Sequence, residues 1–523
     1  MAEKEPETIE RKLVLFNTMT KQKEEFKPIV EGKVSMYVCG VTPYDLSHIG
    51  HARAYVAFDV LHRYLRQLRY DVTYVRNFTD IDDKIIKRAN EAGEDPLKLS
   101  RHFSDEFLVD MAMLQCLPPT HEPRVTEHMN QIRDMISKIM ENGHAYTIEG
   151  DVYFSVDSFP EYCRLSGRKL DDNMAGGGGR VTVDTRKKNP ADFALWKSAK
   201  PGEPSWESPW GQGRPGWHIE CSAMSAQYLG LKFDIHGGGK DLVFPHHENE
   251  LAQSRAANPE SCVSCWMHNG FVNRDNQKMS KSENNFFTIR DIIANYHPLA
   301  LRFFLMRTHY RADVNYSDRA LDNASDRVFY IYQTLQDCEV ALTPFREGTY
   351  KVQVPDDVKE LVQKFHASFF ESMSDDLHTT DVLDDLVEPL KTINGTLKKF
   401  KGVDEGSDYC NNNNLMQGKK QQQALIVALL ALEKEVKEVI GILGLLPTSS
   451  FAEVLKQLKD FALKRAGMTE EELSNKIEER TLARKNKQYD ESDRIRKELT
   501  AVGISLMDEP GGTVWRPCEP SDE

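Results

Sequence analysis

The strongest constraint on the fold is a strand-like run that leads directly into a helix. The run ends at Val38-Cys39-Gly40, and the string His48-Ile49-Gly50-His51 opens a segment in which apolar residues recur at helical spacing, at Ala54, Phe58, Leu61, Leu65 and Leu68. The free N–H groups and the dipole of a helix start favour an anion, and Gly50 lets a ligand approach the backbone closely. The sequence therefore predicts a phosphate site at this helix start, beside two imidazoles.

A second string, Lys278-Met279-Ser280-Lys281-Ser282, supplies two ammonium and two hydroxyl groups on a predicted loop. Such a loop is suited to clamping pyrophosphate, while His48 and His51 can donate hydrogen bonds to phosphate oxygens as charge grows during transfer. Alone, the string at 48–51 also fits a helix start with two surface histidines. Together, the two strings indicate that a nucleoside triphosphate is held while its α-phosphate is attacked, which is an adenylation.

With these strings the chain resembles the class I aminoacyl-tRNA synthetases, and more closely the cysteinyl-tRNA synthetase family. The resemblance runs from about Leu15 to Trp515 and includes the further strings Met36–Gly40, Asn77–Lys87, Pro215–Met224, His236–Leu242 and Pro245–Glu250. It implies an α/β fold in which a Rossmann-like nucleotide-binding catalytic domain is split by an insertion. A helical bundle and a small C-terminal anticodon-binding domain are expected to follow.

The chain of 523 residues is too long for one core, because single cores rarely grow past about 250–300 residues. The predicted division is a first catalytic half (1–121), an insertion (122–200), a second catalytic half (201–285), a stem-contact region (286–340), a helical bundle (341–455) and an anticodon-binding domain (456–523). Gly176–Gly179 is predicted to be a flexible connector. The Asn- and Gln-rich segment 404–423 is predicted to be a disordered loop, because it is too polar to bury.

No apolar run reaches the roughly 18 residues that a membrane span requires. The acidic start of the sequence lacks the apolar segment of a signal peptide, so we expect a cytoplasmic protein with no membrane partner. Nine scattered cysteines favour reduced thiols over a disulfide framework, and some can then bind metal. Cys262-Val263-Ser264-Cys265 has the spacing of a zinc knuckle or redox pair, but no second pair lies near it, and we expect it to be incidental.

A net charge of −14 argues against a nucleic-acid partner when taken alone, because such affinity depends on Lys and Arg meeting phosphates. A large acidic enzyme can still present a basic face to RNA. The resemblance implies tRNA(Cys), L-cysteine and ATP as partners, and we expect no DNA partner. Candidate tRNA contacts lie in and after a predicted charged helix over Glu470–Thr500: Arg480, Arg484, Lys485, Lys487 and Trp515. The alternatives are a solvated helix face and a packed tryptophan.

His246 and Glu250 stand four residues apart in a predicted helix, which places both side chains on one face, as a shared metal ion requires. The residues alone leave other roles open: a buried apolar Cys39, a core Cys221, or a His246 that caps a turn. The resemblance implies one Zn²⁺ held by Cys39, Cys221, His246 and Glu250. Zinc would separate cysteine from serine, because it deprotonates a thiol, whereas an alcohol is a harder ligand that stays mostly protonated.

The same resemblance implies that Gly40, Thr79 and His246 contact the amino acid, and that Trp217 walls its pocket unless it only packs. ATP with Mg²⁺ is expected to contact His48, Gly50, His51, Gly239, Asp241 and Lys281, and the expected catalytic groups are His48, His51, Lys278 and Lys281. Two alternatives stay open: a zinc-dependent ligase that passes cysteine to a sugar amine, and an inactive paralogue kept for RNA binding. The long tail beyond Ser317 favours tRNA over the first, and the intact strings argue against the second.

Overall fold

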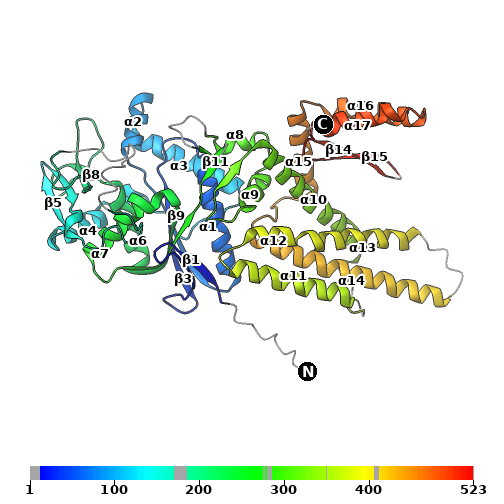
Figure 1. Cartoon of the computed structure of the whole chain (residues 1–523), viewed down its shortest axis with the longest axis horizontal. Helices are drawn as coiled ribbons and strands as arrows, with labels where there is room; N and C mark the ends of the chain where they lie inside the picture. Colours follow the sequence, from blue (N-terminus) through cyan, green and yellow to red (C-terminus); the bar gives the residue numbers. More distant parts are fainter. Residues whose placement is uncertain are drawn as a thin grey trace, which may run out of the picture.

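The structure is a computed structural model that describes residues 12–169, 185–274, 277–279, 286–348, 350, 352–405, 412–509 and 511–521. The predicted connector at Gly176–Gly179 and the predicted catalytic Lys281 lie outside these residues. Figure 1 shows an α/β body from which a bundle of long helices projects, with a small helix-and-hairpin unit near the C-terminus. The predicted fold class, an α/β domain followed by helical and small C-terminal parts, is therefore confirmed.

The body is built on a parallel sheet in the order β10-β9-β3-β4, with bounds Cys262–Asn269, Lys232–Gly239, Lys33–Val41 and Asp71–Phe78. The connecting helices include α1 (Ile49–Gln67), α6 (Trp217–Leu229) and α7 (Glu248–Ala257). The chain leaves β3 through α1 towards β4, whereas β9 pairs with the other edge of β3. The carboxyl ends of β3 and β9 therefore flank a topological switch point, where open α/β sheets bind their ligands.

An insertion lies between the two halves of this sheet. After α2 (Asp83–Ala92) and α3 (Pro96–Met113) it contains α4 (Met129–Glu141) and an antiparallel sheet with the strands β5 (Ala145–Ile148), β6 (Asp151–Phe154), β7 (Phe193–Ser198) and β8 (Gly213–Pro215). Because β8 pairs with β7, the insertion extends past the predicted boundary at residue 200. Helix α4 packs on α6 and α7, which joins the insertion to the second catalytic half.

The second string lies beside a small three-stranded sheet, β12-β11-β13, with bounds Gln277–Lys278, Val272–Arg274 and Val314–Tyr316. Lys278 is the last residue of β12. The chain then continues through α8 (Ile289–Ile293) and α9 (Pro298–Met306). Strand β11 pairs with β12 on one side and with β13 on the other, so the backbone of Lys278 is held in register with the segment that follows α9.

The bundle consists of α10 (Asp318–Leu342), α11 (Asp356–Ser374), α12 (Thr379–Asp385), α13 (Val387–Glu405), α14 (Asn412–Ile442) and α15 (Phe451–Ala466). The prediction of a disordered loop over 404–423 is wrong in the described part, because α13 continues to Glu405 and α14 begins at Asn412. Its Lys and Gln residues are good helix formers, and a helix that projects into solvent need not bury them. Residues 406–411 lie outside the described residues.

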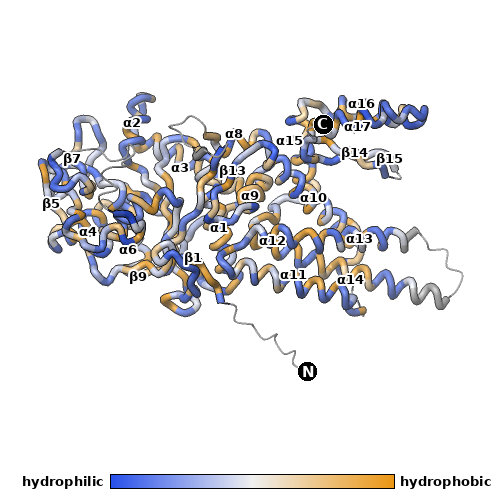
Figure 2. The backbone as a smooth tube through the Cα atoms, viewed as in Figure 1, coloured by the Kyte–Doolittle hydropathy of each residue, from blue (hydrophilic) through white to orange (hydrophobic). Residues whose placement is uncertain are grey.

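The C-terminal unit contains α16 (Glu470–Lys485), α17 (Tyr489–Ala501) and the hairpin β14–β15 (Ile504–Glu509 and Gly512–Pro517). Its own small core includes Leu473, Ile495, Leu499, Ile504 and Leu506. The single helix predicted over Glu470–Thr500 is two helices, because the chain turns between them at Lys487, whose φ is 60°. Figure 2 shows that α16 and α17 are mostly hydrophilic, unlike the inner faces of the bundle.

Across the described ranges, we find no helix with both the length and the apolar character needed to cross a bilayer.

Candidate active site and metal centre

Gly40 lies at the carboxyl end of β3, where the backbone comes so close to β4 that no side chain fits. A Cβ at Gly40 would lie 1.5 Å from the carbonyl oxygen of Asn77. The Gly40 N–H donates to Asn77 Oδ1 at 2.9 Å, and the Asn77 amide donates to Thr79 Oγ1 at 3.3 Å. Gly40 and Thr79 therefore share one amide partner at the switch point, so the structure brings these two predicted cysteine contacts together.

Two histidines build the start of α1. His48 is the N-cap: its Nδ1 accepts from the Gly50 N–H at 3.1 Å, while His51 Nδ1 accepts from the His48 N–H at 3.3 Å. The rings stack with centroids 3.8 Å apart, and a Cβ at Gly50 would lie 2.8 Å from the His48 ring. Because both Nδ1 atoms accept, each neutral ring carries its proton on Nε2. Two ring N–H groups therefore stand at the helix start, where phosphate oxygens could accept from them.

The segment that follows the second string is joined to this helix start. The Ile49 N–H donates to the Phe287 carbonyl at 3.1 Å, and the Ile289 N–H donates to the Ser47 carbonyl at 2.8 Å. The Phe286 ring also meets the His48 ring edge to face, with centroids 6.4 Å apart. Residues 286–289 thus lie against His48, so the chain returns to the first string a few residues after the second.

A buried cluster of metal-binding groups surrounds Cys39. Its Sγ lies 3.8 Å from Cys221 Sγ, 3.5 Å from His246 Nε2 and 3.4 Å from Glu250 Oε1. His246 Nε2 and Glu250 Oε1 are 3.0 Å apart. Ligands of a tetrahedral zinc ion, with Zn–S of about 2.3 Å and Zn–N or Zn–O of about 2.0–2.1 Å, lie about 3.3–3.8 Å from one another. The distances from Cys39 to the other three predicted residues fit this spacing, and the His246–Glu250 pair is slightly closer. The compact group of possible ligands in the described residues, however, contains His247 in place of Cys221.

Burial dominates the electrostatics of this cluster. Cys39 is 6% exposed, and Cys221, His246 and Glu250 are at most 2% exposed. Desolvation raises the pKa of the Cys39 thiol and of the Glu250 carboxyl and lowers the pKa of His246. A bound divalent cation reverses this preference for a thiol and a carboxyl, because it favours their anionic forms. Two thiols, an imidazole and a carboxyl, all buried, form a donor set that suits zinc.

His247 also reaches the cluster, although the sequence analysis did not select it. Its Nε2 lies 3.3 Å from Cys39 Sγ, and it belongs with Cys39, His246 and Glu250 to one compact group of possible ligands. Its Nδ1 contacts His268 Nε2 at 2.8 Å. The adjacent histidines at 246 and 247 were a signal for this role. Helical spacing could not show it, because neighbours on a helix point about 100° apart.

Trp217 and the turn after β9 complete the surroundings. Trp217 begins α6 and stacks on the His246 ring with centroids 4.1 Å apart, so it forms a wall beside the cluster. Gly239 ends β9, and a Cβ there would lie 2.6 Å from Asp241 Oδ1 in the next turn, Lys240–Leu242. A side chain at position 239 would therefore clash with the Asp241 carboxyl, which lies at the carboxyl edge of the sheet.

The five predicted tRNA contacts divide into two groups. Arg480 is 4% exposed and donates to both carboxylate oxygens of Asp508, at 2.8 and 2.9 Å, and Arg484 pairs with the same carboxylate. Trp515 packs against the small C-terminal core, with the Lys459 ammonium 5.0 Å from its ring centroid. These contacts give Arg480 and Trp515 a structural role.

Lys485 and Lys487, by contrast, are exposed. Tyr489, which was not predicted, is 61% exposed at the start of α17 beside them. An aromatic residue inside a charged run was the signal for it.

Cys262 and Cys265 both lie in β10, with Cys262 exposed and Cys265 buried. Three residues of extended strand separate their Cα atoms by about 10 Å, which is too far for a disulfide. The incidental role expected for this pair agrees with its position.

Comparisons with known proteins indicate the family of this chain. Residues 25–326 match the model of the class I tRNA synthetase (C) catalytic domain, and residues 476–516 match the cysteinyl-tRNA ligase anticodon-binding domain. The chloroplastic/mitochondrial cysteine–tRNA ligase of Zea mays is 60% identical, covering 98% of this chain and 87% of that protein. The cytoplasmic cysteine–tRNA ligase 2 of Arabidopsis thaliana is 54% identical, covering 97% and 98%.

Among solved structures, Mycobacterium tuberculosis methionyl-tRNA synthetase in complex with methionyl-adenylate has a TM-score of 0.61 at 15% identity, covering 84% of this chain and 94% of that one. This similarity concerns the fold alone. The family model of the catalytic domain spans more than half of the chain, and the identities to the two ligases extend over nearly its full length. The chain therefore belongs to the cysteinyl-tRNA synthetase family of class I aminoacyl-tRNA synthetases.

Proposed function

We infer that the chain is a cysteine–tRNA ligase, which activates L-cysteine with ATP and transfers it to the 3′ end of tRNA(Cys). The observation that carries this inference is that the helix start at His48 and a buried thiol-rich cluster at Cys39 both lie at the carboxyl end of β3. The anticodon-binding match over 476–516 supports tRNA as the acceptor. Neither a ligase for sugar amines nor an inactive paralogue receives support from the comparisons.

In the first step, the cysteine carboxylate attacks the α-phosphorus of ATP, and pyrophosphate leaves. The Nε2–H groups of His48 and His51 are proposed to donate to phosphate oxygens as negative charge grows there. Lys281, assisted by Lys278, is proposed to offset the charge of the leaving pyrophosphate, together with Mg²⁺. Gly50 admits the nucleotide to the backbone, and Gly239 and Asp241 are proposed to hold adenosine, with Asp241 accepting from the ribose hydroxyls.

In the second step, the terminal ribose hydroxyl of tRNA attacks the activated carbonyl, and AMP leaves. This reaction needs no covalent enzyme nucleophile. It does require the acceptor end of the tRNA to reach the adenylate at the carboxyl edge of the sheet. We propose that residues 286–340 contact the acceptor stem, because α8 and α9 follow directly on the segment that pairs with the helix start.

We propose one zinc ion at Cys39, Cys221, His246 and Glu250. When bound, it supplies a soft cation that takes up the thiolate of the substrate and leaves the hydroxyl of serine mostly protonated. Trp217 is proposed to wall the pocket against His246, while Gly40 and Thr79 contact the amino acid. His247, which also touches Cys39 Sγ, is proposed to orient this sulfur through a contact at 3.3 Å.

The remaining parts are proposed to serve tRNA. The bundle over 341–455 supports the unit over 456–523, which is proposed to read the anticodon. RNA, and not DNA, is the proposed nucleic-acid partner. A cytoplasmic location is proposed by analogy with the cytoplasmic relative, although the maize relative is organellar. Imaging of a C-terminally tagged chain in the source cells tests this location, since the tag would follow the protein into an organelle.

ATP–pyrophosphate exchange, run with each amino acid in turn, tests the activity. We expect exchange with cysteine and none above background with serine. Charging of tRNA(Cys) with labelled cysteine then tests the acceptor. Lys281→Ala should slow exchange by about a hundredfold or more with little change in cysteine affinity. Exchange with cysteine but no charging of tRNA would favour a different acceptor, and no exchange with any amino acid would reject the function.

A further inference from the structure

The loop between β3 and α1 carries an aromatic side chain beside the candidate active site. Tyr44 lies in this loop, which joins the thiol-rich cluster at Cys39 to the helix start at His48. The Tyr44 ring packs against a small apolar cluster of α2 and α3, but it is only half-buried. Because the loop follows the carboxyl end of β3, part of this ring is exposed at the carboxyl edge of the sheet.

Helix α2 presents three cations beside the ring. The helix buries three apolar residues: Ile85, Ile86 and Ala89. Lys84, Lys87 and Arg88 are exposed, and their spacing of three and four residues places them on one face of the helix. The Lys84 ammonium lies 5.7 Å from the centroid of the Tyr44 ring. An aromatic ring and a row of cations therefore adjoin on the surface.

Two ion pairs fix the first turn of α2 to the insertion. Asp83 pairs with Lys197 of β7 at 2.6 Å and also with Arg214 of β8. Strand β8 ends at Pro215, two residues before Trp217, which is the proposed wall of the cysteine pocket. The start of α2 therefore lies beside the strand that leads into this pocket.

The carboxylates near the three cations do not neutralise them. Asp82 is the N-cap of α2, and its carboxylate accepts from the Lys84 N–H at 2.9 Å. The Lys87 ammonium and the Glu91 carboxylate are 3.9 Å apart and both exposed, and such a pair contributes little. Among the described residues, Lys84 and Arg88 form no ion pair. The outer face of α2 is therefore positively charged.

This face continues into the region that is proposed to contact the acceptor stem. Helix α2 packs on α3, and Arg290 of α8 pairs with Asp110 of α3 at 2.9 Å. Figure 1 shows α2, α3 and α8 along the same upper side of the body. An acceptor end that leaves a stem held at α8 would therefore pass along α3 and α2 on its way to the crevice.

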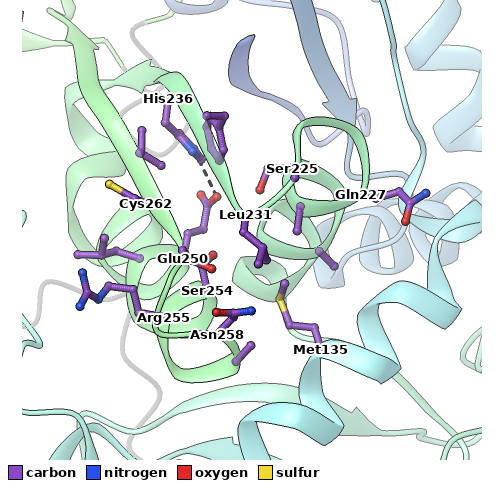
Figure 3. Close-up of a pocket in the computed structure, with 18 of the residues that line it drawn as sticks. Met135, Ser225, Gln227, Leu231, His236, Glu250, Ser254, Arg255, Asn258 and Cys262 are labelled. Carbon is purple, nitrogen blue, oxygen red and sulfur yellow. Dashed lines mark ion pairs between the residues drawn. The ribbon is translucent and has the colours of Figure 1, made fainter. Parts of the chain in front are cut away.

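A cavity elsewhere in the body offers no such route. Figure 3 shows this cavity, whose lining includes Leu231 and Cys262. Leu231 directly precedes β9 and Cys262 begins β10, so this part of the lining lies at the amino edge of the parallel sheet. The adenylate is proposed to form at the opposite edge, where Tyr44 and α2 lie.

We propose that Tyr44 and the α2 face formed by Lys84, Lys87 and Arg88 bind the single-stranded 3′ end of the tRNA. An unpaired base would stack on the Tyr44 ring, and the phosphates of neighbouring nucleotides would meet the three cations. Proteins hold single-stranded nucleic acid by this combination of aromatic stacking and positive charge. The proposal rests on the proposed function, because it takes tRNA as the acceptor, and it adds where the reacting end is held.

Two variants of the full chain test the site. Lys87→Ala with Arg88→Ala removes two cations, and Tyr44→Leu removes the ring. Each should raise the KM for tRNA in charging by about tenfold or more, while cysteine-dependent pyrophosphate exchange stays unchanged. Tyr44→Phe keeps the ring and should charge tRNA like the wild type. Lys33→Ala with Lys138→Ala, exposed on β3 and α4, removes the same charge elsewhere and should change neither reaction.

A double-mutant cycle then assigns the contacts to the 3′ end. Dissociation constants are measured for complete tRNA and for tRNA that lacks its unpaired 3′ nucleotides. The wild type should bind the shortened tRNA about tenfold more weakly, whereas the Lys87→Ala, Arg88→Ala variant should bind both nearly equally. Melting temperatures check that the variant is folded. If the variant loses the same factor for both tRNAs, α2 supports tRNA binding only through the structure, and the site is overturned.

The remaining outcomes also decide the proposal. Slower pyrophosphate exchange in the folded Lys87→Ala, Arg88→Ala variant would assign these cations to ATP and overturn the site. Wild-type charging by this variant and by Tyr44→Leu would overturn the site and leave the proposed function standing. A wild-type chain that activates cysteine but charges no tRNA would instead reject tRNA as the acceptor, and the site with it, so the two failures are distinguishable.

Discussion

Cys39 Sγ and Cys221 Sγ lie 3.8 Å apart, although 182 residues separate them in the chain. Cys39 lies in β3 where its register with β4 shifts between Val38 and Val41, and Cys221 lies in the first turns of α6. The sheet and the helix that packs beside it therefore bring the two sulfurs together. Burial and the neighbouring thiol both raise the pKa of Cys39. A shared cation would offset this cost, because it would bind both sulfurs as thiolates.

Cys221→Ser should lower zinc affinity by more than about 100-fold, since even changes beyond the direct ligands cost about 10–100-fold. The hard hydroxyl replaces a soft thiolate, so the preference for cysteine over serine should fall as well. Metal analysis of the purified protein and exchange assays with both amino acids measure these effects. Cys518→Ser, in the C-terminal segment, is the matched control. A variant that retains full zinc and full discrimination would remove Cys221 from the ligand set.

Much of the fold follows from local periodicity. The alternation of strand-like and helical runs predicts β3, α1 and β4 to within a few residues, because buried parallel strands and amphipathic helices have different spacings of apolar residues. The prediction of a disordered loop over 404–423 is wrong in the described part for a physical reason. Its polarity shows that it cannot enter a core, but it does not show whether the backbone forms a helix in solvent.

Side-chain partners were harder to predict. His247 and His268 lie in different elements and meet only through the fold, so no spacing in the sequence connects them. The charge of Arg480 suggested a contact with RNA, but composition cannot tell a cation that Asp508 already holds from one that is free to meet phosphate. The four predicted metal ligands depended on family resemblance for the same reason, since Cys39 is distant from the others in sequence.

Arg53→Lys should slow cysteine-dependent exchange by about tenfold without changing the KM for cysteine. The Arg53 guanidinium, on α1, donates to the carbonyls of Thr308, His309 and Ala312 and also contacts that of Leu305. It thereby fixes the segment before β13, which pairs with β11 of the hairpin that ends at Lys278. A lysine cannot reproduce the planar fork of donors. A lower kcat with an unchanged KM for cysteine would show that Arg53 acts through the positioning of the phosphate groups.

Arg66→Lys, at an exposed position near the end of the same helix, is the control for Arg53. It should leave both kinetic constants unchanged. A rise in the KM for cysteine in Arg53→Lys with an unchanged kcat would show that the arginine supports the amino-acid pocket instead.

His62→Phe should make the stability of the protein less sensitive to acid. His62 is 5% exposed, and burial lowers its pKa to about 4. Above about pH 6.5 the residue is neutral in both the folded and the unfolded chain. As the pH falls from about 6.5 to 4, the unfolded chain takes up a proton that the folded chain refuses, so the free energy of unfolding falls by up to about 3 kcal/mol.

The slope of melting temperature against pH between 6.5 and 5 measures this effect. Phenylalanine keeps the edge-to-face contact with Tyr74, whose ring centroid lies 5.3 Å from that of His62, so the variant should stay folded. His102→Phe, exposed on α3, is the control. An identical slope in wild type and His62→Phe would show that other groups carry the acid sensitivity.

The final prediction separates tRNA binding from activation. Replacing Lys485, Lys487 and Tyr489 together by alanine should raise the KM for tRNA by about tenfold or more, because two phosphate contacts and one stacking surface are lost. Cysteine-dependent pyrophosphate exchange should stay at the wild-type rate, since these exposed residues lie in the C-terminal unit, outside the catalytic body.

Lys419→Ala with Lys420→Ala, exposed on α14, controls for the loss of charge. Arg480→Ala should instead lower the melting temperature, because it leaves Asp508 without its bidentate partner. Wild-type charging by the folded triple variant would show that tRNA is held elsewhere.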